Sequence, residues 1–175
     1  MTVPLIHLPQ LAKEQEKENG RFRRFLKFQC RVDDAEVDRR VADITQRVWA
    51  QIDCTTCANC CKTVHPTLSE SDVERLARRL YMDRQTFIAQ FLEAEEEAHE
   101  KAWRTRTTPC PFLQDNRCSV YEDRPEDCRG YPYLYEPEFS FRTIAMIERT
   151  ATCPIVFEVM EELKDSLGFR PRAGR

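Results

Sequence analysis

The sequence predicts a mainly α protein: a small single domain in which two irregular, cysteine-rich metal-binding segments interrupt the helices, with at most a short strand or hairpin. Two observations support this fold class. Apolar residues recur every three to four positions over long stretches, as the buried stripe of an amphipathic helix requires. Cysteines instead concentrate in residues 54–66, and prolines and further cysteines in residues 105–138, where a regular helix cannot persist.

Two helices are predicted before the first cysteine cluster. Residues 10–30 place Phe22, Leu26 and Cys30 four positions apart on one face, so we expect Cys30 to be a small buried hydrophobe. Residues 33–51 form a clearer amphipathic helix. Its apolar stripe is Val37, Val41, Ile44, Val48 and Ile52.

Two capped helices are predicted between the cysteine-rich segments. Ser69, with Asp72 three residues later, is typical of the N-cap of a helix over 71–80. Asp83 is expected to cap a second helix over 84–103.

Towards the end of the chain we expect a strand over 139–147 and a helix over 154–167 that Gly168 stops. The predicted organisation is an N-terminal helical extension over 1–52, a cysteine-cluster metal-binding domain over 53–168 and a flexible tail over 169–175.

Composition restricts the function classes. With 41% hydrophobic and 33% charged residues, a force besides apolar packing is expected to hold the fold. The net charge of −3 gives no basic footprint for nucleic acid, and no apolar run is long enough to span a membrane. The first residues do not resemble a secretory signal, so we expect a cytoplasmic protein whose nine cysteines stay reduced.

The first cysteine cluster has the spacing of a metal site. Cys54, Cys57 and Cys60 form two overlapping C-x-x-C turns, and Cys61 follows at once. A C-x-x-C turn brings two sulfurs to one metal, as in tetrahedral zinc sites and iron–sulfur clusters. Adjacent side chains point in different directions on a regular backbone, so Cys60 and Cys61 are expected to face two neighbouring centres, or one of them packs instead of binding.

The remaining candidate ligands come from the second half of the chain. Prolines at 109 and 111 stiffen the backbone around Cys110, and a turn at Asp115-Asn116 is expected to bring Cys118 back towards it. Pro125 is expected to open a short helix with Cys128 in its first turn. The nearby Arg117, Arg124 and Arg129 either offset the charge of metal-bound thiolates or form ordinary surface salt bridges.

Cys153 is the last candidate ligand. It precedes Pro154, which favours the first position of a helix. Cys153 is therefore expected at the N-cap, where unpaired amides and the helix dipole stabilise a thiolate. Eight cysteines are thus predicted to bind metal, the number for two four-thiolate sites or one cluster with accessory ligands: Cys54, Cys57, Cys60, Cys61, Cys110, Cys118, Cys128 and Cys153.

On these residues the sequence resembles the YkgJ-type cysteine-cluster family, also called CxxCxxCC. The resemblance rests on Cys54 to Cys61, on PCPFLQDNRCSVYEDRPEDCRGYP at 109–132 and on Cys153-Pro154. It implies a zinc- or iron-chelating protein, similar to flagellin lysine N-methylases. Residues 1–50 lie outside these motifs, so the resemblance implies nothing about them.

The expected function is to hold zinc or an iron–sulfur centre with clustered thiolates. One alternative is an iron–sulfur oxidoreductase or a component of a protein lysine methylation system, although no catalytic base is recognisable. Another is a structural zinc module for interaction with a protein partner, in which every metal position is filled by the protein. We expect neither nucleic acid nor a membrane as a partner.

Overall fold

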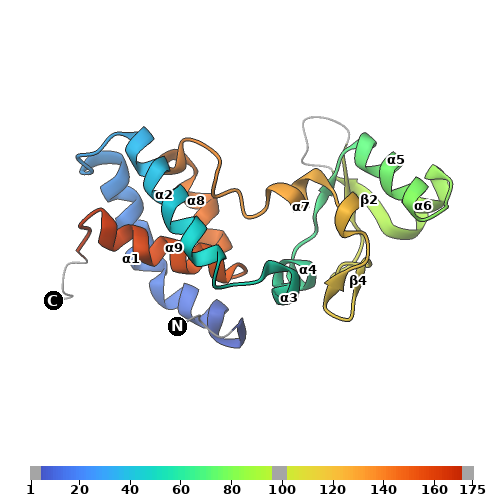
Figure 1. The fold of residues 1–175 in the computed structure, drawn as a ribbon, viewed down its shortest axis with the longest axis horizontal. Coiled ribbons are helices and arrows are strands. Elements are labelled where there is room, and N and C mark those ends of the chain that lie inside the picture. Colours follow the sequence, from blue (N-terminus) through green and yellow to red (C-terminus); the bar gives the residue numbers. More distant parts are fainter. Residues whose placement is uncertain (1–4, 96–101, 171–175) are drawn as a thin grey trace. The chain divides into compact units, whose positions relative to one another are not determined.

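The computed structural model describes residues 5–95 and 102–170, and the chain forms two compact units (Figure 1). We call Met1–Asp53 with Pro132–Arg175 the helical unit, and Cys54–Tyr131 the cysteine unit. This division differs from the expected one, because residues 132–168 join the N-terminal helices and not the cysteine-rich segments. The mainly α class is confirmed.

The helical unit is built from helices contributed by both ends of the chain. α2 packs against α8 and α9, and α1 packs against α8. The expected helices over 10–30, 33–51 and 154–167 are confirmed with small changes at their ends. The elements of this unit are η1 (Leu5–His7), α1 (Leu8–Phe28), α2 (Asp34–Trp49), α8 (Phe139–Arg149) and α9 (Pro154–Ser166).

The segment predicted as a strand over 139–147 is instead α8. Its buried residues Phe139, Thr143 and Met146 recur at helical spacing. Asp38 of α2 accepts hydrogen bonds from the backbone amides of Glu138 (2.8 Å) and Phe139 (2.9 Å). The first amides of a helix need a hydrogen-bond acceptor, and here a carboxylate about 100 residues away in sequence supplies it. The local sequence pattern could not reveal this cap.

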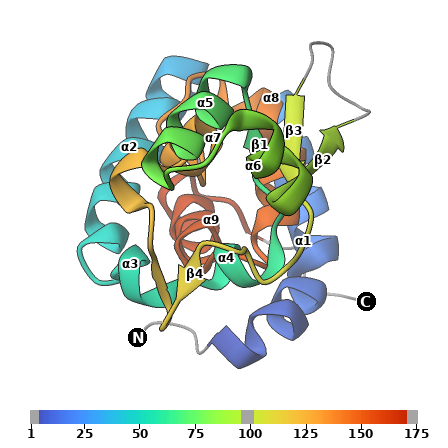
Figure 2. The same cartoon turned by 90° about the vertical axis from the view of Figure 1, so that its right-hand side faces the viewer.

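The cysteine unit combines short helices with two small antiparallel sheets. One sheet has the strand order β1-β3-β2 and the other is the hairpin β4-β5. Together they contain more β-structure than the single short strand or hairpin that the sequence predicted. Figure 2 shows the three-stranded sheet with α5 and α6, and α5 contacts β1 while α6 contacts β2. The helical elements are α3 (Cys54–Cys57), α4 (Asn59–Thr63), α5 (Glu70–Arg79), α6 (Arg84–Phe91), η2 (Tyr121–Asp123) and α7 (Glu126–Gly130). The strands are β1 (Thr67–Leu68), β2 (Leu92–Glu95), β3 (Ala102–Thr105), β4 (Leu113–Gln114) and β5 (Arg117–Cys118).

The helix predicted over 84–103 ends much earlier. The backbone becomes extended at Leu92, and β2 pairs with β3 so that Leu92 lies opposite Thr105. Both of these residues are fully buried, and Arg104 Nε lies 2.8 Å from Glu93 Oε1 across the pair. Pairing with a distant segment therefore overrides the local helix propensity. Residues 96–101 of the predicted helix, and 171–175 of the predicted tail, lie outside the described residues.

No helix within 5–95 or 102–170 has the length and apolarity that crossing a bilayer requires.

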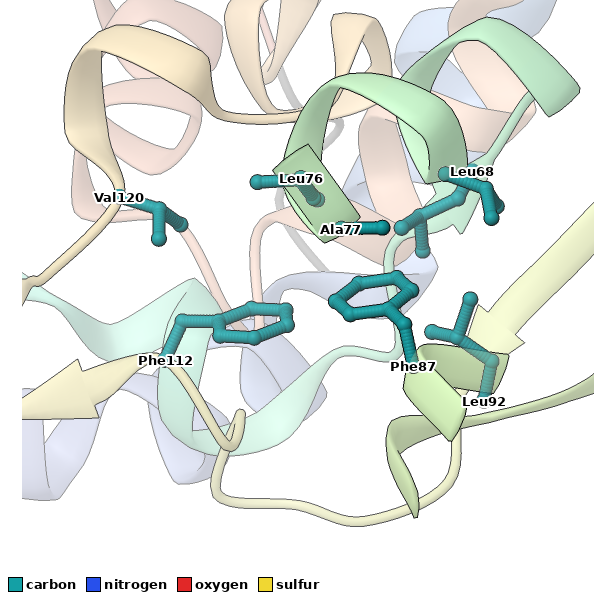
Figure 3. Close-up of a cluster of buried hydrophobic side chains, with 8 residues drawn as sticks. Leu68, Leu76, Ala77, Phe87, Leu92, Phe112 and Val120 are labelled. Carbon is teal, nitrogen blue, oxygen red and sulfur yellow. The ribbon is translucent and has the colours of Figure 1, made fainter. Parts of the chain in front are cut away.

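An apolar core holds the cysteine unit together on the side of α5 and α6 (Figure 3). The ring of Phe87 stacks on that of Phe112 with centroids 6.1 Å apart and lies 5.4 Å from that of Phe91. Phe112 follows Cys110 by two residues, so this core also fixes a cysteine-bearing segment. The core residues are Leu68, Val73, Leu76, Ala77, Phe87, Leu92, Phe112 and Val120.

We predict that Phe87→Ala lowers the free energy of unfolding by about 3–5 kcal/mol, because it removes a fully buried ring and leaves a cavity. Denaturant unfolding followed by circular dichroism measures the change. Phe28→Ala is the control: that side chain is 80% exposed, and its loss is expected to change stability by no more than about 0.5 kcal/mol. Equal effects of the two substitutions would contradict the assigned core.

Candidate metal centre

Seven of the eight predicted ligands lie in the cysteine unit, and Cys153 lies in the helical unit. None of the nine cysteines, all of which the structure describes, forms a disulfide. The donor set is therefore a group of thiols in the state that binds metal.

Two short helical turns carry the first four cysteines. α3 holds Cys54 and Cys57, α4 holds Cys60 and Cys61, and Ala58 joins them with a φ of 50°. This left-handed conformation costs a non-glycine residue roughly 1–2 kcal/mol. Ala58 is 5% exposed, so its methyl group gains packing that glycine would lack. The bend separates the two pairs of thiols, and nothing in the local sequence pattern indicated it.

Cys60 and Cys61 lie closer together than expected. Their Sγ atoms are 4.0 Å apart, whereas we expected adjacent side chains to point in different directions. Two sulfurs bound to one zinc with bonds of about 2.3 Å lie about 3.8 Å apart in a tetrahedral site. The separation is therefore compatible with one shared ion as well as with two adjoining centres.

The second motif returns to the first through backbone hydrogen bonds. The amide of Cys110 donates to the carbonyl of Cys61 at 2.7 Å. Asp115 and Asn116, both with positive φ, form the two-residue turn between β4 and β5, so Cys118 pairs with Leu113. Leu113 in turn donates its amide to the carbonyl of Cys110 at 3.0 Å. The predicted turn is confirmed, and α3 also packs against β5.

Cys128 is held by the start of α7. Pro125 is the N-cap of this helix and not its first residue, and Cys128 lies in the first turn as expected. The carboxylate of the neighbouring Asp127 accepts a hydrogen bond from the amide of Thr67 at 2.8 Å. This bond attaches α7 to β1, close to the end of the first cysteine motif.

Four thiols act on one another electrostatically: Cys61, Cys110, Cys118 and Cys128. Burial raises the pKa of Cys110 to about 11, and the charges of Cys61 and Cys118 add to the shift. Burial also raises the pKa of Cys128, and there Asp127 and the other three thiols contribute in the same direction. A negative charge on one of these thiols therefore makes ionisation of the others less favourable.

Cys61 is the exception among the four. A hydrogen bond from Cys60 lowers the pKa of Cys61 to about 7, although burial acts in the opposite direction. A thiolate at Cys61 is thus the first to form as pH rises. For the remaining three thiols, a nearby cation would reverse the unfavourable charge balance.

The arginines of the second motif hold the loop in place. Arg124 lies over the ring of Tyr121, 3.9 Å from its centroid, and donates to the Tyr121 carbonyl at 2.6 Å. Arg129 donates to the carbonyls of Glu122 and Arg124. Burial raises the pKa of Cys118, and the positive charge of Arg124 partly opposes that shift. Arg124 is therefore the arginine whose charge acts on a candidate ligand.

A buried carboxylate that the sequence pattern marked only as a helix cap also positions Cys128. Asp72, 2% exposed, accepts from the Ser69 hydroxyl at 2.8 Å and from the Glu126 amide at 3.3 Å. It also pairs with Arg75, which donates to the carbonyls of Asp123 (3.2 Å) and Arg124 (3.0 Å). The Asp72–Arg75 pair therefore fixes both the start of α5 and the segment that leads into α7.

The two remaining cysteines, Cys153 and Cys30, belong to the helical unit. Cys153 is the N-cap of α9 as predicted, and its side chain is 6% exposed within the core of the helical unit. Cys30 lies beyond the end of α1 and is only half-buried, so the prediction of a buried Cys30 is wrong. The reason is that the helix ends at Phe28, before the apolar stripe reaches Cys30.

The thiols do not surround a single point at which an ion could bind. Among the residues that the structure describes, no three His, Cys, Asp or Glu side chains form a group that could hold a metal ion as they stand. The chemistry of the donor set nevertheless fits zinc or iron, because thiolates are the characteristic ligands of both tetrahedral zinc and iron–sulfur clusters. Binding would have to draw these side chains together.

We predict that Asp72→Asn lowers the free energy of unfolding by about 1–3 kcal/mol at neutral pH, the cost of disrupting a buried hydrogen-bonded charge. Burial acts to raise the pKa of Asp72, but bonds from Ser69 and Arg75 outweigh it and hold the pKa below its ordinary value of 3.8. This stabilisation is therefore present above the ordinary value and is lost as pH falls through the lower folded-state value.

Acid unfolding followed by circular dichroism tests this pH dependence. The difference in stability between the natural protein and Asp72→Asn is expected to shrink as the pH drops below 3.8. Asp165→Asn provides the control, since that side chain is 86% exposed. A difference that stays constant across this range would rule out the assigned charge.

A comparison with known protein families covers the segments that carry these cysteines. The family model CxxCxxCC, described as "Putative zinc- or iron-chelating domain", matches residues 53–154. No curated protein and no solved structure matches the chain. Because the family model covers more than half of the 175 residues, the chain belongs to the CxxCxxCC family of zinc- or iron-chelating domains.

Proposed function

We propose that the cysteine unit holds zinc or an iron–sulfur centre through the thiolates of its seven cysteines. One observation carries the proposal: Cys61, Cys110, Cys118 and Cys128 come from separate segments and yet lie close enough for each charge to act on the others. Four thiolates complete one tetrahedral centre.

The remaining thiols of the unit belong to a second centre in this proposal. Cys54, Cys57 and Cys60 have the C-x-x-C-x-x-C spacing. Cys54 and Cys57 precede the bend at Ala58, and Cys60 follows it on α4 beside Cys61. Cys60 and Cys61 then stand where the two centres adjoin. This assignment keeps the expectation that the adjacent pair serves two ions.

The bound metal supplies the positive charge that the site otherwise lacks. Burial and mutual repulsion oppose ionisation of Cys110, Cys118 and Cys128, and a cation removes that opposition. The role that follows most directly is structural, because these thiols join the segments of a unit that has only a small apolar core. Reduced thiols of this kind fit a reducing compartment such as the cytoplasm.

Anaerobic purification followed by metal analysis and a visible absorption spectrum tests the proposed function. A colourless protein with stoichiometric zinc, or a brown one with iron and acid-labile sulfide, supports it and identifies the metal. Cys110→Ser is expected to lose metal because it removes a ligand that joins two motifs. Cys30 lies in the helical unit, so the control variant Cys30→Ser should keep the metal content of the natural protein. A natural protein without tightly bound metal would refute the proposal.

We further predict that Cys60→Ser and Cys61→Ser each reduce the bound metal by about one ion per chain, and that the double substitution removes both. The physical reason is that each thiol belongs to a different centre. Metal analysis after gel filtration measures the stoichiometry. If the double variant loses no more metal than either single one, the two thiols share one ion and the paired-site interpretation fails.

A further inference from the structure

The exposed side of α1 carries a stripe of positive charge. Lys13, Lys17, Arg21, Arg24 and Lys27 follow one another along this helix at intervals of three or four residues, and all five are exposed. Residues at this spacing lie on one face of an α-helix. The stripe is about 21 Å long, because each residue of a helix adds about 1.5 Å. We call these five residues the basic stripe.

The cations of the basic stripe form no ion pair within residues 5–95 and 102–170. Two carboxylates of the same helix have other partners: Glu14 accepts a hydrogen bond from Gln10 at 2.9 Å, and Glu18 pairs with Lys164 at 3.0 Å. No acidic residue occurs in the sequence between Glu18 and Asp33. The charge of the stripe is therefore not neutralised by its own helix.

The helix dipole accounts for only part of this charge. Cations stabilise a helix when they lie in its last turn, and Lys27 lies there. Lys13, Lys17 and Arg21 lie about two turns or more before the end of α1, where the dipole no longer favours a cation. Like charges three or four residues apart on a helix repel one another, and an acidic partner would remove that repulsion.

Exposed aromatic residues lie on and beside the basic stripe. Phe28 follows Arg24 by four residues and is 80% exposed. Lys27 lies 5.9 Å from the ring centroid of Phe141 on α8, which is 64% exposed. Aromatic and arginine residues are the types that contribute most to binding at protein interfaces.

The neighbouring surface of α8 offers further apolar contact. Phe141 and Ile144, three residues apart, line a groove of about 380 Å³, and Ile144 is 51% exposed. The charged residues that line this groove balance one another: Glu136, Glu148, Arg142 and Arg149. The groove therefore adds apolar surface without net charge, and the attraction for an anionic partner comes from the basic stripe.

We propose that the basic stripe and Phe28 form a docking surface for an acidic segment of another protein, one that also presents an apolar side chain. The carboxylates of that segment pair with the stripe, and its apolar side chain covers Phe28. This inference is independent of the metal, because α1 belongs to the helical unit and the seven clustered thiols belong to the cysteine unit.

Two other anionic partners fit the structure less well. A bilayer takes up the apolar face of an amphipathic helix, but that face of α1, which includes Phe22 and Leu26, is buried in the helical unit. A nucleic-acid duplex presents phosphates at its surface, which give Phe28 no apolar contact. The net charge of −3 also opposes its approach.

Fluorescence anisotropy with two labelled synthetic peptides tests the proposal on the full-length protein. One peptide of about 14 residues, the length of the stripe, is rich in glutamate and contains one phenylalanine. The other has serine in place of the phenylalanine. We expect the phenylalanine peptide to bind more tightly, and its affinity to fall as ionic strength rises.

Two variants separate the charged and apolar contributions. Arg21→Glu/Arg24→Glu is expected to weaken binding of both peptides about tenfold or more, because attraction becomes repulsion at two positions. Phe28→Ala should weaken binding of the phenylalanine peptide and leave that of the serine peptide unchanged. Circular dichroism confirms that each variant is folded.

Arg47→Glu/Arg78→Glu is the matched control, because it reverses two exposed charges outside α1 and should keep the affinity of the natural protein. Three results would overturn the proposal. The natural protein binds neither peptide, the control variant loses as much affinity as the stripe variant, or Phe28→Ala affects both peptides equally. Tighter, stripe-dependent binding of phosphatidylserine vesicles or of a DNA duplex would overturn it too, and would assign the surface to that partner instead.

Discussion

The constraint on which the cysteine unit depends is the mutual repulsion of thiolates in a half-buried site. Burial and the charges of Cys61 and Cys118 raise the pKa of Cys110 to about 11. Burial also raises the pKa of Cys128, and the charge of Asp127 acts in the same direction. A hydrogen bond from Cys60 lowers the pKa of Cys61 to about 7. A bound cation would allow these thiols to ionise together. We therefore expect the cysteine unit to fold and bind its metal in one coupled step.

Several contacts within the cysteine unit hold the thiol-bearing segments near one another. The bend at Ala58, the two-residue turn at Asp115-Asn116 and the bond from Thr67 to Asp127 each fix one segment. The buried Asp72, paired with Arg75, accepts a hydrogen bond from the Glu126 amide at the start of α7. Together these contacts reduce the loss of conformational entropy that accompanies metal binding.

The sequence predicted those parts of the fold whose cause is local. The stripes of α2 and α9, the cap at Ser69 and the hairpin turn at Asp115-Asn116 depend on residues within a few positions of one another. The two wrong predictions, a strand over 139–147 and a helix reaching 103, depend on partners far away in sequence. Asp38 determines where α8 starts, and pairing with β3 determines where α6 ends.

The same distinction applies to the candidate site. Cysteine spacing identified the thiols, because ligand type and spacing are local properties of a metal motif. Spacing does not reveal packing, and only the structure shows that Cys153, the N-cap of α9, is buried in the core of the helical unit. Nor could it predict that Nδ1 of His65 lies 2.6 Å from the carbonyl oxygen of Thr105, 40 residues away in sequence. A local sequence pattern carries no information about such a contact, because the contact forms only when distant segments fold together.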